Sequence, residues 1–103
     1  MKTNQPYTLG IWTVKPGNEA AFIAEWGSFA QWSSKNQRGA DTAYLLQDSD
    51  RPQQFISFGG WESPENIKEW RGRPEFQAFV SKARPLCEEF QPHSMKLVAV
   101  AGQ

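Results

Sequence analysis

The sequence predicts an α+β fold for this chain of 103 residues, and two observations lead to that class. Four segments are rich in β-branched and aromatic residues, as strands are, and the regions between them carry apolar residues at helical spacing. Their order is β-α-β-β-α-β, with the second helical region split in two. This order is the ferredoxin-like, or split βαβ, arrangement around one antiparallel sheet. A chain of this length usually forms one domain, so we expect residues 1–103 to be a single domain.

The first part of the chain is expected to form a strand followed by a long helix. Residues 7–15 (YTLGIWTVK) have the composition of a strand. A Pro-Gly pair follows, and Asn18 stands where an N-cap residue would start a helix at Glu19. The helical spacing is carried by Phe22, Trp26, Phe29 and Ala30. We expect this helix to end within residues 33–37.

Two more strands and a second helix start are expected next. Residues 41–47 and 54–61 predict strands, and the turn-forming residues 48–52 between them predict a hairpin. Ser63 is a favourable N-cap residue, and Pro64 fits the first helical position. A short helix is therefore expected to begin directly after the third strand.

The last part of the chain predicts another helix and a final strand. Pro74 is expected to start the helix after the break at "RGRP", with an apolar side made of Phe76, Phe79, Val80 and Ala83. Pro85 should kink or restart this helix, and Leu86 and Phe90 extend its apolar side. Residues 94–100 (SMKLVAV) predict the last strand.

Alternation along the strands predicts that both faces of the sheet are apolar. In the strand 54–61, one face carries Phe55, Ser57, Gly59 and Trp61, and the other carries Ile56, Phe58 and Gly60. The helices of one chain cover only one face, and a bare apolar face is costly in water. We therefore expect a second copy of the chain to cover the other face, which predicts a homodimer.

Composition and charge disfavour several classes of partner. Eleven basic residues balance eleven acidic ones, so no long-range attraction to nucleic acid or to anionic membranes is expected. No apolar run approaches the ~20 residues of a membrane span, and the first ten residues have no signal-peptide pattern; we expect a cytoplasmic protein. The single cysteine, Cys87, allows no internal disulfide, and no spacing predicts a metal site or a phosphate loop.

Three stretches together resemble the antibiotic biosynthesis monooxygenase superfamily. They are "VKPGNEAAFIAEW", "YLLQDSDRPQQFISFGGWES" and "IKEWRGRPEFQ", and the resemblance covers about residues 11–100. It is carried by their order, which is a strand, Pro-Gly, a helix, a hairpin, Trp-Glu-Ser, a helix and Pro-Glu-Phe. The resemblance implies a dimeric α+β barrel, in which two ferredoxin-like sheets pack face to face.

The resemblance implies more than one kind of activity. Some members of the family oxidise polyketide quinone precursors with molecular oxygen and no bound cofactor, others degrade haem, and many have no assigned activity. The haem-degrading branch uses a histidine on the helix after the third strand, where Trp70 stands here, and an asparagine on the first strand, where Gly10 stands. Because an indole cannot ligate iron, haem degradation is disfavoured, and we expect a colourless protein with no cofactor and no metal.

Four residues are candidates for binding a small aromatic ligand. The resemblance implies that Trp61 lines the pocket, where it could stack on a substrate and donate its N–H. Trp12 could wall the same cavity, Tyr44 could hydrogen-bond a ligand oxygen, and Arg71 could gate the pocket or bind an acidic group. The alternative is core or interface packing for Trp12 and Trp61, a half-buried strand position for Tyr44 and a surface position for Arg71. Gly59 and Gly60 are expected to leave space beside the sheet.

The expected function is cofactor-independent oxygenation of a small aromatic or polyketide-like molecule. The alternative is a non-catalytic, small-molecule-binding or stress-related protein of the same fold. No catalytic residue is assigned, because the only histidine, His93, is expected in an exposed loop. Trp70 lies three residues after Ile67 on one helical face, so we expect it to be mainly a packing residue, although it could also wall the same cavity as Trp12. Its truncation should then cost more stability than truncation of Trp61.

Overall fold

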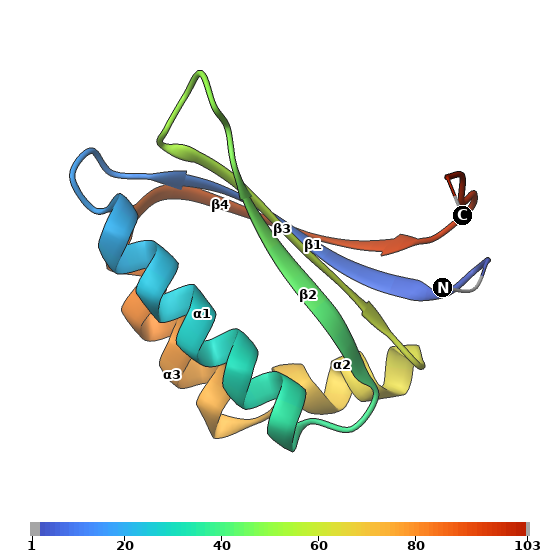
Figure 1. Cartoon of the computed structure of the whole chain (residues 1–103). Coiled ribbons are helices and arrows are strands. Elements are labelled where there is room, and N and C mark those ends of the chain that lie inside the picture. Colours follow the sequence, from blue (N-terminus) through green and yellow to red (C-terminus); the bar gives the residue numbers. More distant parts are fainter. Residues whose placement is uncertain (1–2, 103) are drawn as a thin grey trace.

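The computed structural model describes residues 3–102, which form one four-stranded antiparallel sheet with helices on one face (Figure 1). In chain order the elements are β1 (Pro6–Val14), α1 (Glu19–Asn36), β2 (Ala40–Gln47), β3 (Gln54–Trp61), α2 (Pro64–Arg71), α3 (Pro74–Ala83), a 3₁₀ turn (Arg84–Leu86) and β4 (Cys87–Lys96). The strand order across the sheet is β2-β3-β1-β4. The predicted ferredoxin-like fold is confirmed.

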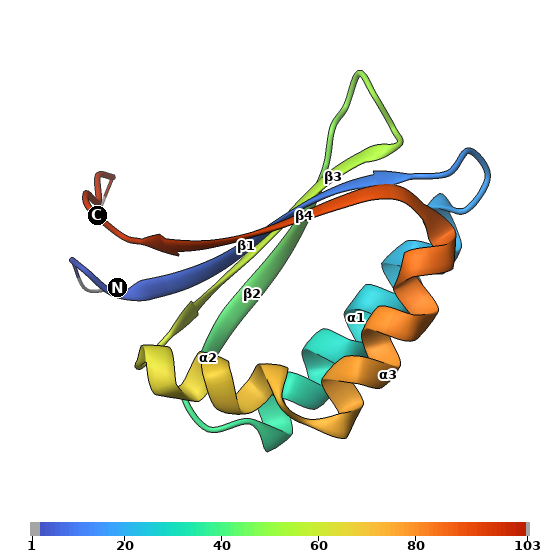
Figure 2. The same ribbon diagram turned by 180° about the vertical axis from the view of Figure 1, so that it is seen from behind.

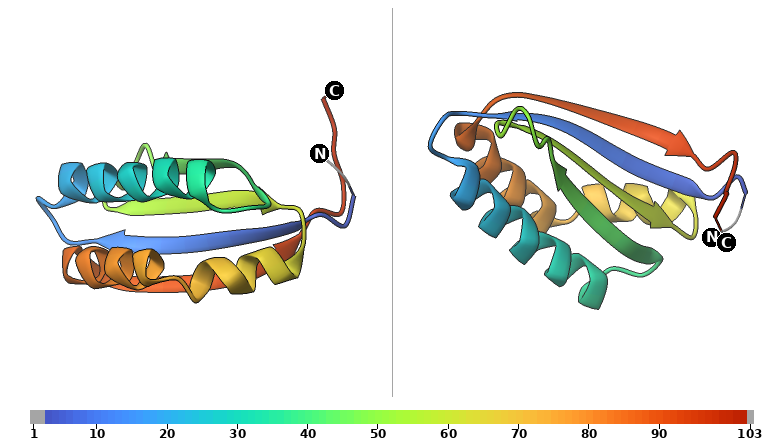
Figure 3. Two further views of the ribbon diagram at one scale, coloured as in Figure 1. Left: turned by 90° about the horizontal axis from the view of Figure 1, so that it is seen from below. Right: turned by 45° about the horizontal axis from the view of Figure 1, so that its top comes forward.

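The helices form two rows on the same face of the sheet. Seen from below, α1 makes one row, and α2 and α3 follow one another in the second (Figure 3). In the view from behind, all the helices drawn lie below the sheet and none lies above it (Figure 2). None of the helices within residues 3–102 is both long and apolar enough to cross a bilayer.

The register of the central strand β1 decides which side chains share a face. Trp12 pairs with Phe55 of β3 on one side and with Phe90 of β4 on the other. Because side chains alternate along each strand, these three rings lie on the helical face. Val14, Phe22 and Phe79 join them in the core. The sheet and the helices thus meet through a layer rich in aromatic rings.

The two helix starts predicted from capping residues differ in how they are made. At α2, the Ser63 hydroxyl accepts a hydrogen bond from the Asn66 N–H at 3.3 Å, and Pro64 occupies the first turn, as expected of an N-cap. At α1, Asn18 holds the N-cap position, but its side chain makes no capping bond. Its amide instead donates to the Leu86 carbonyl at 3.5 Å, which ties the start of α1 to the turn before β4.

The prediction for the end of the chain was wrong in the bounds of its elements. The helix does not continue past Pro85, which lies in the 3₁₀ turn directly after α3. The strand β4 begins at Cys87, seven residues before the predicted start, and ends at Lys96 rather than at Val100. Phe90 consequently lies on a strand, where its ring stacks on Trp12 with centroids 3.8 Å apart. Pairing with β1 outweighs the weak strand propensity of this polar segment. Pro92 is tolerated because β4 is an edge strand.

The face of the sheet away from the helices carries a set of exposed apolar side chains. Its most exposed members are Tyr44, Leu46, Ile56 and Met95. The Tyr44 ring stacks on Phe58 of the neighbouring strand, with centroids 5.2 Å apart. We call this surface the open sheet face, and its apolar character is as the alternation predicted.

Candidate functional site

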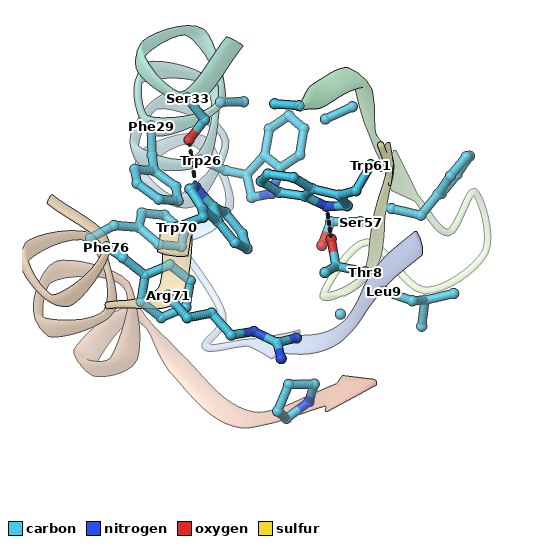
Figure 4. Close-up of a pocket in the computed structure, with 18 of the residues that line it drawn as sticks. Thr8, Leu9, Trp26, Phe29, Ser33, Ser57, Trp61, Trp70, Arg71 and Phe76 are labelled. Atoms are coloured by element: carbon cyan, nitrogen blue, oxygen red, sulfur yellow. Dashed lines mark hydrogen bonds between the residues drawn. The ribbon is translucent and has the colours of Figure 1, made fainter. Parts of the chain in front are cut away.

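A cavity of about 1000 Å³ lies between the helical face of the sheet and the three helices (Figure 4). Its floor is formed by the four strands of the sheet, and its walls come from α1, α2 and α3. The side chains that define its character are Thr8, Trp12, Trp26, Phe29, Ser33, Ser57, Trp61, Trp70, Arg71, Phe76 and Phe90. A volume of this size is at the upper end of what pockets for drug-sized ligands show.

Aromatic rings form the walls of the cavity. Trp61, at the end of β3, lies with its ring centroid 4.8 Å from that of Trp70 on α2, at an interplanar angle of 48°. Trp70 stacks on Phe29 of α1 at 5.5 Å and meets Phe76 of α3 edge-on at 4.8 Å. Rings in such tilted and edge-to-face pairs hold one another in place. The wall is therefore a fixed aromatic surface built from β3 and all three helices.

Three of the four tryptophans that line the cavity donate their indole N–H to a hydroxyl group. Trp12 donates to Ser57 at 3.0 Å, Trp61 donates to Thr8 at 3.1 Å, and Trp70 donates to Ser33 at 2.9 Å. Figure 4 shows the second and third of these bonds. The N–H of Trp61, which was expected to be available to a ligand, is thus used within the protein. The ring face of Trp61 remains available as cavity wall.

The structure brings together three of the four candidate residues. Trp61, Trp12 and Arg71 all line the cavity. Tyr44 does not, because it pairs with Phe58 and lies on the open sheet face. Its assignment as a contact of this cavity was wrong: alternation places Leu45, not Tyr44, on the helical face of β2.

Trp70 and Trp61 differ from the roles expected of them. Trp70 packs on its neighbours, as expected, but also lines the cavity. Trp61 is the more buried of the two, with 4% of its surface exposed, whereas Trp70 is half-buried. From this difference in burial we expect Trp61→Ala to cost more stability than Trp70→Ala, which is the opposite of the order expected from the sequence.

The two glycines before Trp61 do not leave empty space. A β-carbon at Gly59 would lie 3.1 Å from that of Ala43, and one at Gly60 would lie 3.2 Å from the Tyr7 ring. Gly60 thus makes room for a ring of the protein itself on the open sheet face. Gly59 borders the cavity, but the space beside it is already taken by β2.

Gly10 lies at the floor of the cavity, where the neighbouring side chains pack tightly against it. A β-carbon there would stand 2.8 Å from the Trp12 indole nitrogen, 2.9 Å from the Ser57 hydroxyl and 3.0 Å from the Phe90 ring. The hydrogen bond between Trp12 and Ser57 and the stacking of Trp12 on Phe90 both occupy the space that a larger residue would need. A side chain at this position therefore disrupts the floor.

Gly27, in the middle of α1, is the opposite case and allows a test of the cavity wall. It lines the cavity, and a β-carbon there would meet nothing within 4 Å. Alanine is favoured over glycine inside a helix by about 0.8–1 kcal/mol. We expect Gly27→Ala to raise the free energy of unfolding by up to about 1 kcal/mol in urea titrations. Gly10→Ala should lower it, and a Gly27→Ala variant that is less stable than the wild type would contradict the open space beside α1.

Hydroxyl residues are the part of the site that sequence analysis missed. Thr8 and Ser57 lie at diagonal positions on the paired strands β1 and β3, and Ser33 is buried on α1. The available signal was period-two spacing: Thr8 precedes Trp12 by four residues, and Ser57 precedes Trp61 by four, which puts each pair on one face. The Thr8 hydroxyl on β1 accepts from Trp61 on β3, and the Ser57 hydroxyl on β3 accepts from Trp12 on β1.

The titratable groups near the cavity are few. His93 borders the cavity, but it pairs with Leu9 of β1. Alternation along the paired strands directs the side chains of both residues away from the helices. Burial raises the pKa of the Cys87 thiol, and nearby Lys15 partly opposes that shift. The thiol is in the core cluster, where it packs as a small hydrophobe. Within residues 3–102, no group of three or more His, Cys, Asp or Glu residues is placed to hold a metal ion.

The fold and the cavity together define a class: a ferredoxin-like α+β protein with an aromatic pocket between its sheet and its helices. The family model for antibiotic biosynthesis monooxygenase matches residues 9–82. The chain therefore belongs to the antibiotic biosynthesis monooxygenase family, and the resemblance seen in its sequence is confirmed.

Solved structures of similar fold come from several bacteria. SnoaB, a cofactor-independent oxygenase from Streptomyces nogalater, aligns over 97% of this chain and 95% of its own, at 18% identity and a TM-score of 0.81. A variant of SnoaB aligns over 97% of this chain and 99% of its own, at 16% identity and a TM-score of 0.88. A Bordetella bronchiseptica protein, provisionally assigned as an antibiotic biosynthesis monooxygenase, aligns over 93% of this chain and 99% of its own, at 22% identity and a TM-score of 0.81.

At these identities the likeness concerns the fold alone. A search of curated proteins gives no match to this chain.

Proposed function

We propose that the protein is a cofactor-independent monooxygenase that oxidises a small aromatic or polyketide-like substrate with molecular oxygen. The observation that carries this proposal is the cavity of about 1000 Å³ walled by Trp61, Trp70 and Phe76. Membership of the antibiotic biosynthesis monooxygenase family and the shared fold with SnoaB, a cofactor-independent oxygenase, support it.

The proposed reaction needs no electron donor other than the substrate. A phenol loses its hydroxyl proton, and the electron-rich ring of the phenolate reacts with O₂ at the carbon opposite the oxygen. Loss of water then gives a quinone. One oxygen atom becomes the new carbonyl group, and the other leaves in water with the hydroxyl hydrogen and the ring hydrogen. The phenol gives up four electrons, and O₂ takes up four.

The cavity favours such a reaction through its shape and its dryness. Flat aromatic walls fix the ring of the substrate in one orientation, which removes part of the entropic barrier. The apolar lining keeps water away from the reactive anion. The hydroxyl groups of Thr8 and Ser57 reach the cavity from the floor and can hydrogen-bond an oxygen of the substrate.

The alternative function is a non-catalytic container for an aromatic molecule. The observation that favours it is that the indole N–H groups of Trp12, Trp61 and Trp70 are engaged by protein hydroxyls, which is typical of a rigid binding pocket. Oxygen consumption separates the two functions. With α-naphthol and dihydroxynaphthalenes, an oxygenase consumes O₂ above the buffer rate without added cofactor, whereas a container only raises the melting temperature.

The open sheet face supports a homodimer. We propose that a second copy of the chain covers Leu46, Ile56 and Met95, which are 55%, 42% and 46% exposed in the single chain. An uncovered apolar surface of this kind is costly in water. Family membership supports the same arrangement, in which two sheets pack face to face. A cytoplasmic location stays a prediction from the sequence.

Sedimentation at micromolar concentration should give a mass near twice 11.7 kDa. Ile56→Asp should shift the protein toward the monomer, because it places a charge within the proposed interface. Ile23→Asp is the matched control, since Ile23 on α1 is similarly exposed, at 44%, but lies away from the open sheet face. A wild-type protein that is monomeric across this range would show the proposed interface to be wrong.

A further inference from the structure

Arg71 is placed unlike the neighbouring cations of α2 and α3. It is the last residue of α2, it is half-buried, and its side chain extends into the cavity below Trp61 (Figure 4). Within residues 3–102, its guanidinium group makes no hydrogen bond, ion pair or ring contact. Arg73, two residues later, donates to the Asn36 carbonyl at 3.0 Å and lies over the Trp32 ring.

Stabilisation of the helix end explains why residue 71 is positively charged, but not why its side chain extends into the cavity. A cation in the last turn interacts favourably with the helix dipole, and Lys68 on the same helix provides this from an exposed position outside the cavity. A guanidinium carries five N–H donors in a planar fork that matches a carboxylate. Directing this fork into an aromatic cavity without a protein acceptor leaves its donors for a ligand.

The hydroxyl groups on the floor are also oriented as donors. The oxygens of Thr8 and Ser57 accept the N–H groups of Trp61 and Trp12. A hydroxyl has one hydrogen, and in the described part of the chain neither hydroxyl donates it to an acceptor. Both hydrogens are therefore left for the cavity, on the side toward which Arg71 extends (Figure 4).

The acidic group at the cavity is already engaged. The carboxylate of Asp41 accepts from the Thr42 N–H at 2.8 Å and from the Gln5 amide at 3.4 Å, and the residue is exposed. Arg84, the other arginine at the cavity, is also exposed. The half-buried polar groups that face a ligand are thus donors, and one of them is positively charged.

We propose that the ligand is an aromatic anion, and that Arg71 binds its negatively charged oxygen while Thr8 or Ser57 donates a hydrogen bond. This inference rests on the proposed function, because it takes the ligand to be an aromatic molecule in this cavity. The anionic oxygen can belong to a carboxylate or to an ionised phenol. Both have the same chemistry: a charged, planar oxygen group next to an aromatic ring.

The test compares two probes that differ in charge but hardly in shape. β-Naphthoate carries a carboxylate, and β-naphthamide carries a neutral amide on the same ring. Titration calorimetry of the full chain should show that wild-type protein binds β-naphthoate more tightly. Arg71→Gln should weaken β-naphthoate binding by about tenfold or more, the effect of losing one charge-assisted hydrogen bond. Binding of β-naphthamide should change by less than about twofold.

Two further variants make the result specific. Lys68→Gln removes one positive charge from the same helix and should leave both affinities unchanged, since Lys68 is exposed and lies outside the cavity. Arg71→Lys keeps the charge but not the planar fork, so it should bind β-naphthoate more tightly than Arg71→Gln does. Because the Arg71 guanidinium has no protein partner, Arg71→Lys should leave the melting temperature unchanged, and Arg71→Gln should lower it only slightly, through the loss of one charge at the end of α2.

The outcomes separate this inference from the proposed function. Equal binding of the two probes by wild-type protein, or equal losses in Arg71→Gln and Lys68→Gln, would overturn the role of Arg71 and leave the aromatic pocket standing. If neither probe bound, the aromatic pocket itself would be wrong, and this inference with it.

To separate the two sources of charge, α-naphthol is titrated at pH values below and above its pKa. Binding only above that pKa identifies an ionised phenol as a ligand, and β-naphthoate binding alone identifies a carboxylate.

Discussion

Replacing Phe22 with alanine should lower the free energy of unfolding by about 3–5 kcal/mol, the range for truncating a buried aromatic residue. Phe22 is fully buried, and its ring lies 4.9 Å from the Trp12 centroid and 5.2 Å from that of Phe55. It is the contact through which α1 reaches the middle of the sheet. A loss of this size removes a large part of the stability of an ordinary domain.

Urea titration of Phe22→Ala and Ile23→Ala measures this effect. Ile23 is the next residue of α1 and is 44% exposed, so its truncation should cost less than about 1 kcal/mol. The difference between the free energies of unfolding of the two variants reports the effect of burial and not of helix propensity, because both substitutions place alanine in the same turn. Similar losses in both variants would show that Phe22 does not hold α1 on the sheet.

Replacing Trp61 with alanine should reduce both stability and ligand binding. Trp61 is 4% exposed, contacts Trp70 and donates to Thr8. Its loss should cost about 3–5 kcal/mol and weaken the binding of β-naphthamide, the neutral probe, at least about tenfold. The reason is that the ring is one wall of the cavity, so its removal leaves the substrate ring without a stacking surface.

Trp61→Phe separates these two effects. It keeps an aromatic ring but removes the N–H that donates to Thr8, so we expect most of the stability and most of the affinity for β-naphthamide to remain. Trp26→Phe, at another tryptophan of the cavity wall, is the comparison variant. Unchanged binding of β-naphthamide to a folded Trp61→Ala protein would mean that Trp61 does not line the binding site.

The parts of the fold that sequence analysis predicted correctly are those with local signals. Ser63 and Pro64 mark the start of α2 through capping chemistry, and β3 was predicted with the bounds that the structure shows, residues 54–61. β4 was missed because "CEEFQPHS" has little strand propensity and contains a proline. Only its pairing with β1 makes it a strand, and that pairing is a contact distant in the sequence.

The candidate site was predictable to the extent that strand alternation and family resemblance determine it. Trp12 and Trp61 follow from those two signals. Tyr44 was misplaced because alternation shows that it faces away from Leu45 but not which of the two faces the helices cover. The hydrogen bonds from indoles to hydroxyls could not be predicted, since they depend on the register between β1 and β3.

The central claim is that this cavity oxygenates an aromatic substrate without a cofactor, and isotope labelling tests it most directly. The protein is dialysed against a chelator and incubated with α-naphthol under ¹⁸O-labelled O₂, and the quinone product is analysed by mass spectrometry. We predict a quinone that carries one labelled oxygen atom, formed faster than in buffer without protein and with no flavin, haem or metal added. A quinone without label, or formation no faster than in buffer across a panel of naphthols, would contradict the account.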